Sequence, residues 1–160
     1  MMSHIRQARG RRRRRGSRGG NALIETSLAL IVLLWVAMGM VEFGQFLYMK
    51  QAFNAAARDG ARVASINTGT QAKVVAAVTA GLQQANVAYN ASWLTITDLT
   101  TGTAVTDITS VTSGDSLRVT VSVNYDQIPN VVRPLYTMTA TRFGIKNGKP
   151  ITGTCTMLKE

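Results

Sequence analysis

The sequence predicts an α+β protein, with a long N-terminal transmembrane helix and a second helix packed on a small antiparallel β-sheet. Three observations favour this fold class. Residues 22–41 contain a single charged side chain, Glu25, and no proline interrupts residues 21–66. Beyond Trp93 the composition changes to Thr, Val, Ser and Gly, and apolar and polar residues alternate along residues 117–125. That alternation is typical of a strand with one buried face.

The basic character of the chain is concentrated at its N-terminus. The net charge is +10, and residues 1–20 supply +8 of it through eight arginines and no acidic residue. Residues 21–160 therefore carry only +2, from ten basic and eight acidic side chains. An arginine run can neutralise nucleic-acid phosphates, but no aromatic or folded element accompanies this one. We expect a positively charged segment that stays in the cytoplasm ahead of a membrane helix, and no nucleic-acid partner.

The apolar segment that follows is long enough to cross a bilayer. The 20 residues of 22–41 span about 30 Å as a helix, the thickness of the hydrocarbon core. The uninterrupted apolar run, residues 28–41, spans about 21 Å. Glu25 therefore lies either at the interface of a short span or inside a full-length one. A central carboxylate costs roughly 2.5–3.5 kcal/mol, which makes Glu25 a functional candidate.

The helix is predicted to continue beyond residue 41, because apolar and small residues recur at spacings of three and four. Two ladders of small residues have the four-residue spacing that lets another helix approach closely. Gly60 costs nearly 1 kcal/mol relative to Ala inside a helix, and close packing would offset that cost. The alternative is that an alanine-rich stretch is simply a good helix. The ladders are Ala56, Gly60 and Ala64, and Ala57 and Ala61.

A second helix is predicted over residues 71–87, with Thr70 as its N-cap. Its apolar stripe, which we expect to pack on the sheet, consists of Val74, Val75, Val78, Leu82 and Ala85.

The remaining elements are strands and turns. Residues 94–99 and 104–108 flank a turn at 100–102, which predicts a hairpin. Residues 117–125 form the clearest strand, and residues 150–158 form a final strand after an Asn-Gly turn signal at 147–148. We assign no structure to residues 127–146.

No pattern of catalytic or metal-binding residues is present in the sequence. The single histidine, His4, lies in the basic leader, and no Cys/His cluster has metal-ligand spacing. The single cysteine, Cys155, cannot form an internal disulfide. Residues 144–149 are similar to a phosphate loop but are one residue short, and Pro150 replaces the required hydroxyl. We therefore expect no catalytic residue, metal, cofactor or small-molecule substrate, and a protein that is not an enzyme.

The sequence GGNALIE at residues 19–25 resembles the processing site of type IV prepilins. The resemblance implies that a prepilin peptidase cuts after Gly20, which gives Asn21 a free α-amine with an ordinary pKa near 7.7–8.0. In that family the glutamate, here Glu25, neutralises such an amine, often on the neighbouring subunit. Pairing the two charges in lipid is much cheaper than leaving both unpaired. The alternative is an ordinary signal anchor whose Glu25 reaches the cytoplasmic surface.

The residues after the span resemble TadE-like proteins, the minor pseudopilins of Tad (Flp) pilus systems. The resemblance is carried by Glu42, Phe43 and Gly44, shortly after the apolar run, and by the block ARDGAR at residues 57–62. The close match covers roughly residues 19–65. The long, dense arginine run of the leader departs from the pattern.

This resemblance implies a structural and assembly component of a Tad (Flp) type IV pilus involved in surface attachment. Its partners would be the membrane, other pilins or pseudopilins of the same system, and the prepilin peptidase. The implied organisation is a cleaved cytoplasmic leader at 1–20, a transmembrane and extended helix at 21–66, and an extracytoplasmic α+β domain at 67–160. The protein would cross the inner membrane once. Two alternatives stay open: a type II secretion pseudopilin, and a signal-anchored surface domain that binds a ligand and never assembles.

Overall fold

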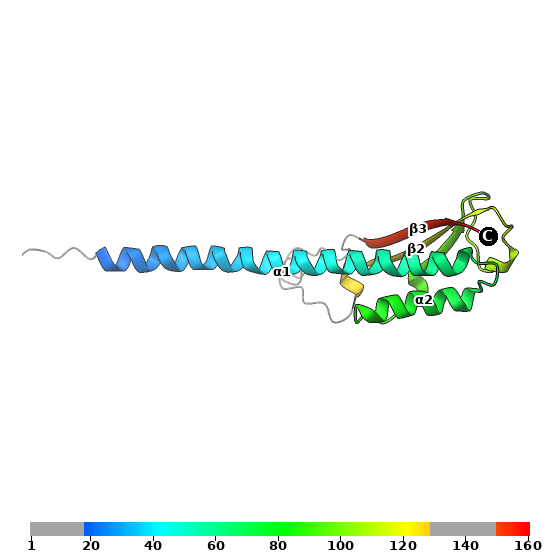
Figure 1. Ribbon diagram of the computed structural model, residues 1–160. Helices are drawn as coiled ribbons and strands as arrows, with labels where there is room; N and C mark the ends of the chain where they lie inside the picture. The colour runs from blue at the N-terminus through cyan, green and yellow to red at the C-terminus, as the bar shows by residue number, and fades with distance from the viewer. Residues whose placement is uncertain (1–17, 129–149) are drawn as a thin grey trace, which may run out of the picture. The chain divides into compact units, whose positions relative to one another are not determined.

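The computed structural model describes residues 18–128 and 150–160, which form helices and an antiparallel sheet (Figure 1). The predicted α+β fold class is confirmed. The two α-helices are α1 (Arg18–Ser65) and α2 (Gln71–Gln84), and the strands are β1 (Leu94–Asp98), β2 (Ser116–Asn124) and β3 (Pro150–Leu158). Three short 3-10 helices connect them: η1 (Ala91–Trp93), η2 (Ile108–Ser110) and η3 (Tyr125–Gln127).

Internal contacts divide the chain into two compact units, Met1–Ala37 and Met38–Glu160. Helix α1 contributes to both units. In the first unit its side chains are exposed throughout residues 20–37. In the second unit, residues 38–65 of α1 belong to the same folded body as the sheet and α2. The expected division into a leader, a membrane helix and an outer domain after residue 66 concerns the position of each part relative to a membrane, and it stays a prediction.

The sheet has the order β1-β2-β3, and both pairs are antiparallel. Central strand β2 alternates between inward apolar and outward polar side chains, as the sequence pattern predicts. Its inward residues are Leu117, Val119, Val121 and Val123, all buried. In the register of the sheet, Val119 lies opposite Ile96 of β1 on one side and opposite Cys155 of β3 on the other. Strand β3 has the predicted bounds, 150–158.

The second arm of the predicted hairpin, residues 104–108, is not a strand. A single bridge between Thr97 and Ala104 is all the pairing the described residues show there. Asp107 then accepts hydrogen bonds from the backbone N–H of Thr109 at 3.0 Å and from its hydroxyl at 2.7 Å, which starts η2. Local side-chain hydrogen bonds of this kind compete with a strand ladder.

The end of the second helix also differs from the predicted one. The expected N-cap is confirmed, since the Thr70 hydroxyl accepts from the N–H of Lys73 at 3.4 Å. The helix ends at Gln84 rather than at residue 87 because Asn86 adopts a left-handed φ of 57°. The N–H of Val87 then bonds back to the carbonyl of Leu82 at 3.0 Å. Asparagine is one of the few residues that tolerates this helix-ending conformation.

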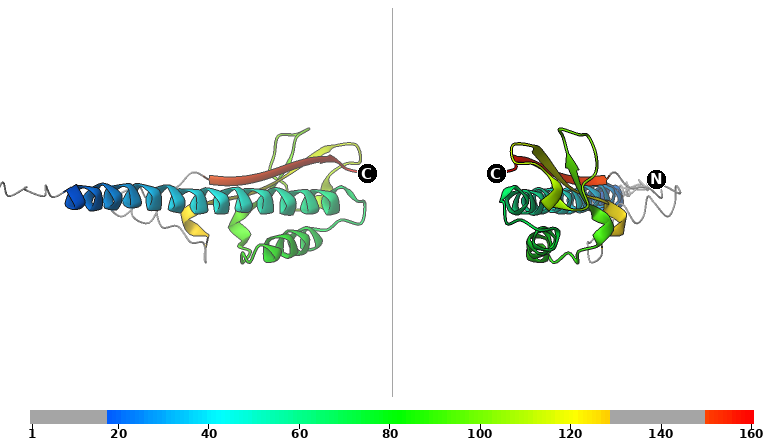
Figure 2. Two further views of the ribbon diagram at one scale, coloured as in Figure 1. Left: turned by 60° about the vertical axis from the view of Figure 1, so that its left-hand side comes forward. Right: turned by 90° about the vertical axis from the view of Figure 1, so that its right-hand side faces the viewer.

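Within the second unit, α1 lies between the sheet and α2 (Figures 1 and 2). The stripe of α2 packs against α1 and approaches β2 where α1 has Gly60. A Cβ on Gly60 would lie 2.7 Å from Val78 of α2 and 3.4 Å from Val119 of β2. Of the predicted stripe, Val74, Val78, Leu82 and Ala85 are buried, and Val75 is half-buried. The layer order is therefore sheet, α1, α2. The second helix packs on α1 and not directly on the sheet as expected, because α1 lies between them.

The core lies on both sides of α1. Its largest fully buried side chains are Phe53, Leu82, Ile108, Leu117, Ile128 and Ile151. The ring of Phe53 lies 6.2 Å, centroid to centroid, from that of Trp93. Residues of all three strands and both helices thus share one core, which stabilises the domain without a disulfide.

Strand β3 contacts the backbone of α1 at Gly153. A Cβ at this position would overlap the carbonyl group of Phe53 and would lie 2.7 Å from the N of Asn54. Only glycine lets the strand approach the helix this closely.

We expect Gly153→Ala to destabilise the domain, because the obstructing atoms belong to backbone and cannot rotate away. Overpacking a core costs about 1–3 kcal/mol and occasionally more. Thr154→Ala is the matched control, since Thr154 is the next residue of β3 and is exposed; its cost should stay within about 0.5 kcal/mol. Urea unfolding of the full chain in detergent, followed by tryptophan fluorescence, measures both. Equal midpoints for the two variants would contradict the close contact.

Candidate functional site

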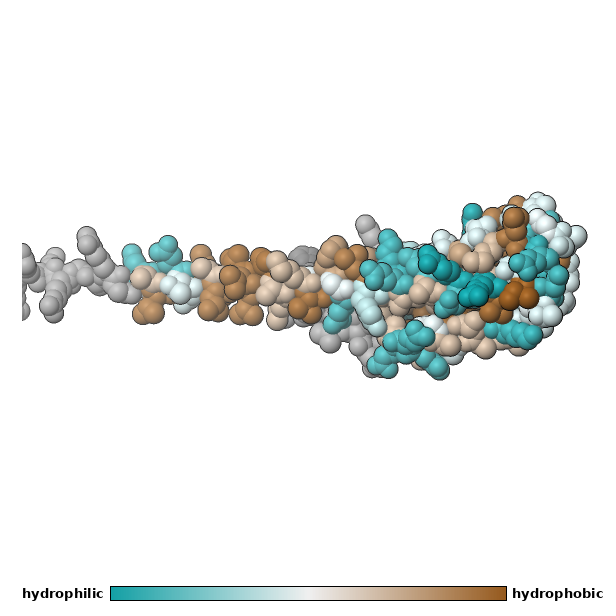
Figure 3. All heavy atoms as spheres, in the orientation of Figure 1, coloured by the Kyte–Doolittle hydropathy of each residue, from teal (hydrophilic) through white to brown (hydrophobic). Residues whose placement is uncertain are grey.

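The first part of α1 is an exposed apolar surface. Helix Gly20–Ser65 is long and apolar enough to cross a membrane, with a mean hydropathy of 2.1 in its most apolar window. Figure 3 shows hydrophobic residues along the visible side of this stretch. An apolar surface of this extent is typical of contact with lipid or with another protein. Its exposed large side chains are Leu23, Ile24, Leu28, Leu30, Ile31, Val32, Leu33, Leu34, Trp35 and Val36.

The predicted processing and pairing residues all lie at the start of α1. Gly20, Asn21 and Glu25 are exposed, and Asn21 and Glu25 are four residues apart, on one face of the helix. A Cβ added to Gly20 would meet nothing within 4 Å. Packing in the described chain therefore gives no reason for glycine at position 20.

The neighbouring hydroxyl groups are satisfied inside the helix. The Thr26 hydroxyl donates to the carbonyl of Ala22 at 2.8 Å, and the Ser27 hydroxyl donates to that of Leu23 at 2.8 Å. Such i−4 bonds let Ser and Thr enter lipid without an external acceptor. Glu25 is thus the one ionisable side chain between residues 20 and 41, and its carboxylate is the one charge that a membrane-spanning helix would have to accommodate there.

The small-residue ladders are buried within the domain itself. A Cβ on Gly81 of α2 would lie 3.0 Å from Cα of Ala56, so α1 and α2 are nearly in backbone contact there. Gly60 faces Val74 and Val78 of α2 on one side and Val119 of β2 on the other. The four alanines of the ladders, Ala56, Ala57, Ala61 and Ala64, are at most 1% exposed.

In the structure the ARDGAR block has a buried side and an exposed side. Its small residues, Ala57, Gly60 and Ala61, are buried, whereas its charged residues, Arg58, Asp59 and Arg62, are exposed. The buried half of the block therefore serves the packing of α1 against α2 and the sheet.

The residues that follow the apolar run are placed differently. Glu42 is half-buried and makes an interaction. Phe43 is 62% exposed, and a Cβ on Gly44 would meet nothing within 4 Å. The structure thus brings the small residues of 56–64 together but leaves Phe43 and Gly44 on the outside of the helix.

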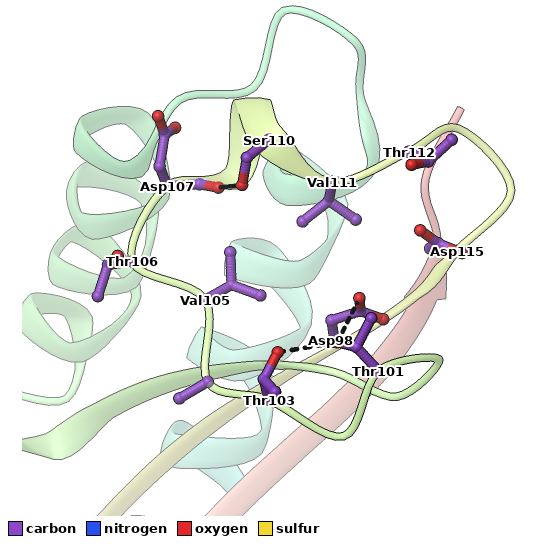
Figure 4. A pocket seen from close by; sticks show the side chains of 11 residues that line it. Asp98, Thr101, Thr103, Val105, Thr106, Asp107, Ser110, Val111, Thr112 and Asp115 are labelled. Carbon is purple, nitrogen blue, oxygen red and sulfur yellow. Dashed lines mark hydrogen bonds between the residues drawn. The ribbon is translucent and has the colours of Figure 1, made fainter.

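An open pocket of about 310 Å³ lies among the loops that follow β1 and precede β2 (Figure 4). Asp98, Asp107 and Asp115 line it together with several hydroxyl side chains. Asp98 accepts from the N–H of Thr100 and from the hydroxyl of Thr101, both at 2.8 Å. In the part of the chain that the structure describes, no group of three or more His, Cys, Asp or Glu side chains could hold a metal ion.

Local hydrogen bonds explain the titration of the two loop aspartates. The N–H of Thr100, followed by the hydroxyl of Thr101, lowers the pKa of Asp98 below its ordinary value of 3.8. The pKa of Asp107 is also lowered, first by the Thr109 hydroxyl, then by the Thr109 N–H and weakly by the charge of Lys159. Both carboxylates therefore stabilise turns through local hydrogen bonds.

Residues 159 and 160 contact these loops and the end of α1, which was not predicted from the sequence. Lys159 is only 6% exposed, and its ammonium donates to the carbonyl of Ile108 at 3.2 Å. Its backbone pairs with Asp115 and Gly114, each at 2.8 Å, and the N–H of Glu160 donates to the carbonyl of Ser65 at 2.8 Å. No local pattern predicts the burial of Lys159, because its partners lie far away in the sequence.

The Asp98 turn predicts a pH dependence of stability. Because the folded pKa of Asp98 is depressed, its stabilising contribution is present above the unfolded pKa and is lost as the pH falls through the folded value. We expect Asp98→Asn to lower the unfolding midpoint at pH 7, and the difference from wild type to shrink below about pH 4. Thr101→Val removes one donor to Asp98 and should produce part of the same effect. A difference that stays constant from pH 7 to pH 3 would contradict this role.

Comparison with known protein families gives a match over the first part of the chain. Residues 20–62 match the family model of the TadE-like protein. Curated proteins and solved structures give no match to the chain. The matched residues begin at Gly20, include the exposed apolar part of α1, and end at the last arginine of the ARDGAR block. Residues 20–62 therefore form a TadE-like segment, similar to a family associated with Tad pili.

Proposed function

We propose that this protein is a minor pseudopilin that helps to assemble a Tad (Flp) type IV pilus used in surface attachment. The observation that carries the proposal is the coincidence of the TadE-like match, residues 20–62, with one helix that has two different environments. Its first part exposes apolar side chains on all sides, and its later part is the centre of a folded domain. A subunit that is anchored in a membrane and presents a domain to other subunits needs this division.

The orientation follows from charge. The eight arginines of residues 1–20 favour a cytoplasmic position for the N-terminus, by the positive-inside rule. The domain of residues 67–160 would then lie outside the inner membrane, with α1 as the single crossing. An external domain that lacks an internal disulfide depends on its core, and the described core is continuous from α2 through α1 to the sheet.

Processing after Gly20 would prepare the helix for assembly. No described residue packs around Gly20, so the described fold does not require a small residue there, whereas a peptidase site would. Cleavage would remove the arginines and leave Asn21 with an α-amine. The mature helix would then carry that amine and the carboxylate of Glu25 at the same end.

Glu25 would pair with an α-amine, its own or that of a neighbouring subunit. Two unpaired charges in a low-dielectric medium are each expensive, and pairing recovers much of the cost. Asn21 and Glu25 lie about one helical turn apart, so a neighbouring helix shifted by one turn would place its amine beside this carboxylate. The partners in this proposal are other pilins or pseudopilins, and the prepilin peptidase acts on the chain as its substrate.

The first test concerns cleavage. We expect a mature N-terminus at Asn21, and we expect Gly20→Glu to keep the leader because a large charged side chain replaces the small residue at the site. Gly20→Ala is the matched control, since it stays small and should still be cut. N-terminal sequencing and intact mass of the protein from native membranes measure the outcome. An arginine-rich N-terminus on mature wild-type protein would refute the processing step.

The second test concerns Glu25. Glu25→Gln keeps size and helix propensity but removes the charge, so insertion and cleavage should survive while assembly fails. Removing one partner of a fully buried pair costs about 3–5 kcal/mol, and even about 1.4 kcal/mol changes an equilibrium tenfold. Glu25→Asp retains the charge and should preserve part of the activity. Membrane fractionation, processing and pilus counts in each strain measure the three steps. Normal pilus numbers with Glu25→Gln would contradict the pairing and would mean that Glu25 is only an interfacial residue.

A further inference from the structure

Five exposed apolar side chains gather where α1 enters the second unit. They are Met40, Val41, Phe43, Leu47 and Tyr48, and their exposed fractions run from 41% to 70%. We call this set the collar. Buried or half-buried side chains of the same turns, Phe46 and Met49, point instead into the domain, where the ring of Phe46 meets that of Tyr125 edge-on at 5.6 Å. The domain therefore uses one side of these turns and leaves the collar side uncovered by the described residues.

The collar covers a broad arc of the helix. At about 100° per residue, the five collar residues occupy a continuous arc of about 160° around the helix axis. Their order along this arc is 43, 47, 40, 48 and 41. Gly44 lies within that arc, and a Cβ added to it would meet no atom of the described residues within 4 Å. A single partner helix buries a narrower seam, whereas a lipid environment contacts every outward side chain. The breadth of the arc favours lipid as its occupant.

The collar ends abruptly at a polar turn. The next exposed residues of α1 are Lys50, Gln51 and Asn54, and Gln51 lies on the same face as Leu47, one turn further on. From Met40 to Tyr48 the helix rises about 12 Å. Each interfacial layer of a bilayer, between hydrocarbon and water, is about 5–8 Å thick. The collar is therefore long enough to span one interfacial layer and to reach the outer acyl carbons beside it.

Its residue types suit the same environment. Tyr48 combines an apolar ring with a hydroxyl, the amphipathic character that concentrates aromatic residues at the membrane–water boundary. Lys50 is exposed immediately beyond the collar, where its ammonium can reach anionic lipid phosphates while its stem stays on the apolar side.

We propose that the collar is a lipid-interface surface, which places the base of the domain among the headgroups of the membrane that α1 crosses. In this arrangement Phe43 and Leu47 contact the outer acyl carbons, and Lys50 and Gln51 lie in the aqueous part of the headgroup layer. The inference rests on the membrane anchoring included in the proposed function, but it does not require pilus assembly.

A matched pair of positions tests it. In the full-length Cys155→Ser protein, single cysteines at Leu47 and Gln51 carry an environment-sensitive fluorophore in vesicles of phosphatidylethanolamine and phosphatidylglycerol. We expect blue-shifted emission at position 47, with quenching by nitroxide lipids and protection from aqueous iodide. We expect the reverse at position 51. Phe43→Cys repeats the first measurement, and thermal unfolding checks that each variant is folded.

The possible outcomes are distinct. Free access of iodide to positions 43 and 47, in protein that floats with the vesicles, would overturn the collar proposal and leave the anchor intact. Protein that fails to float would instead overturn the anchor. Shielding from both quenchers that is lost when the protein is diluted with excess lipid would show that the collar binds another protein, and this would also overturn the proposal.

Discussion

The domain depends on the close approach of backbone on two sides of α1. On one side Gly81 brings α2 against Ala56, and on the other Gly153 brings β3 against the carbonyl of Phe53. Between these contacts, Gly60 lets Val78 and Val119 approach the helix from opposite layers. Each glycine removes a side chain that would otherwise separate two elements. A domain of this size has little apolar area to bury, so tight packing around one central helix contributes more than added volume would.

The same helix is adapted to two environments along its length. From Gly20 to Ala37 its side chains are exposed and almost wholly apolar, whereas between Met49 and Ala64 most of its small residues and Phe53 are buried in protein. Hydroxyl groups in the first part bond to their own helix, as at Thr26 and Ser27. Charged residues return in the second part on the exposed side, as at Arg58 and Asp59. The two parts of this helix thus differ in composition as expected for an apolar medium and an aqueous one.

Much of this fold could be predicted from local pattern, and the exceptions share a physical cause. Alternation along 117–125 predicted β2, and Thr70 predicted the start of α2, because both signals depend on neighbouring residues. The strand expected at 104–108 failed because Asp107 bonds to the backbone of Thr109 and starts a 3-10 turn. The helix expected to reach residue 87 ends early at Asn86. The burial of Lys159 and its bond to Ile108 join residues distant in the sequence, which no local pattern can show.

The residues of the candidate site also differ in how far local sequence pattern could explain them. The glycine at position 60 was recognised as a position of close packing from its spacing, but the sequence could not say whether the partner was another chain or another part of the same one. The structure places Val78 and Val119 of the same chain there. Gly20 and Glu25 have no such internal explanation, since both lie on the exposed start of α1. The TadE-like segment therefore combines two kinds of constraint. Its residues near the C-terminal end are required by the fold of this domain. Its residues near the N-terminal end, Gly20 and Glu25 among them, are exposed, so the packing of the described residues does not account for their identity.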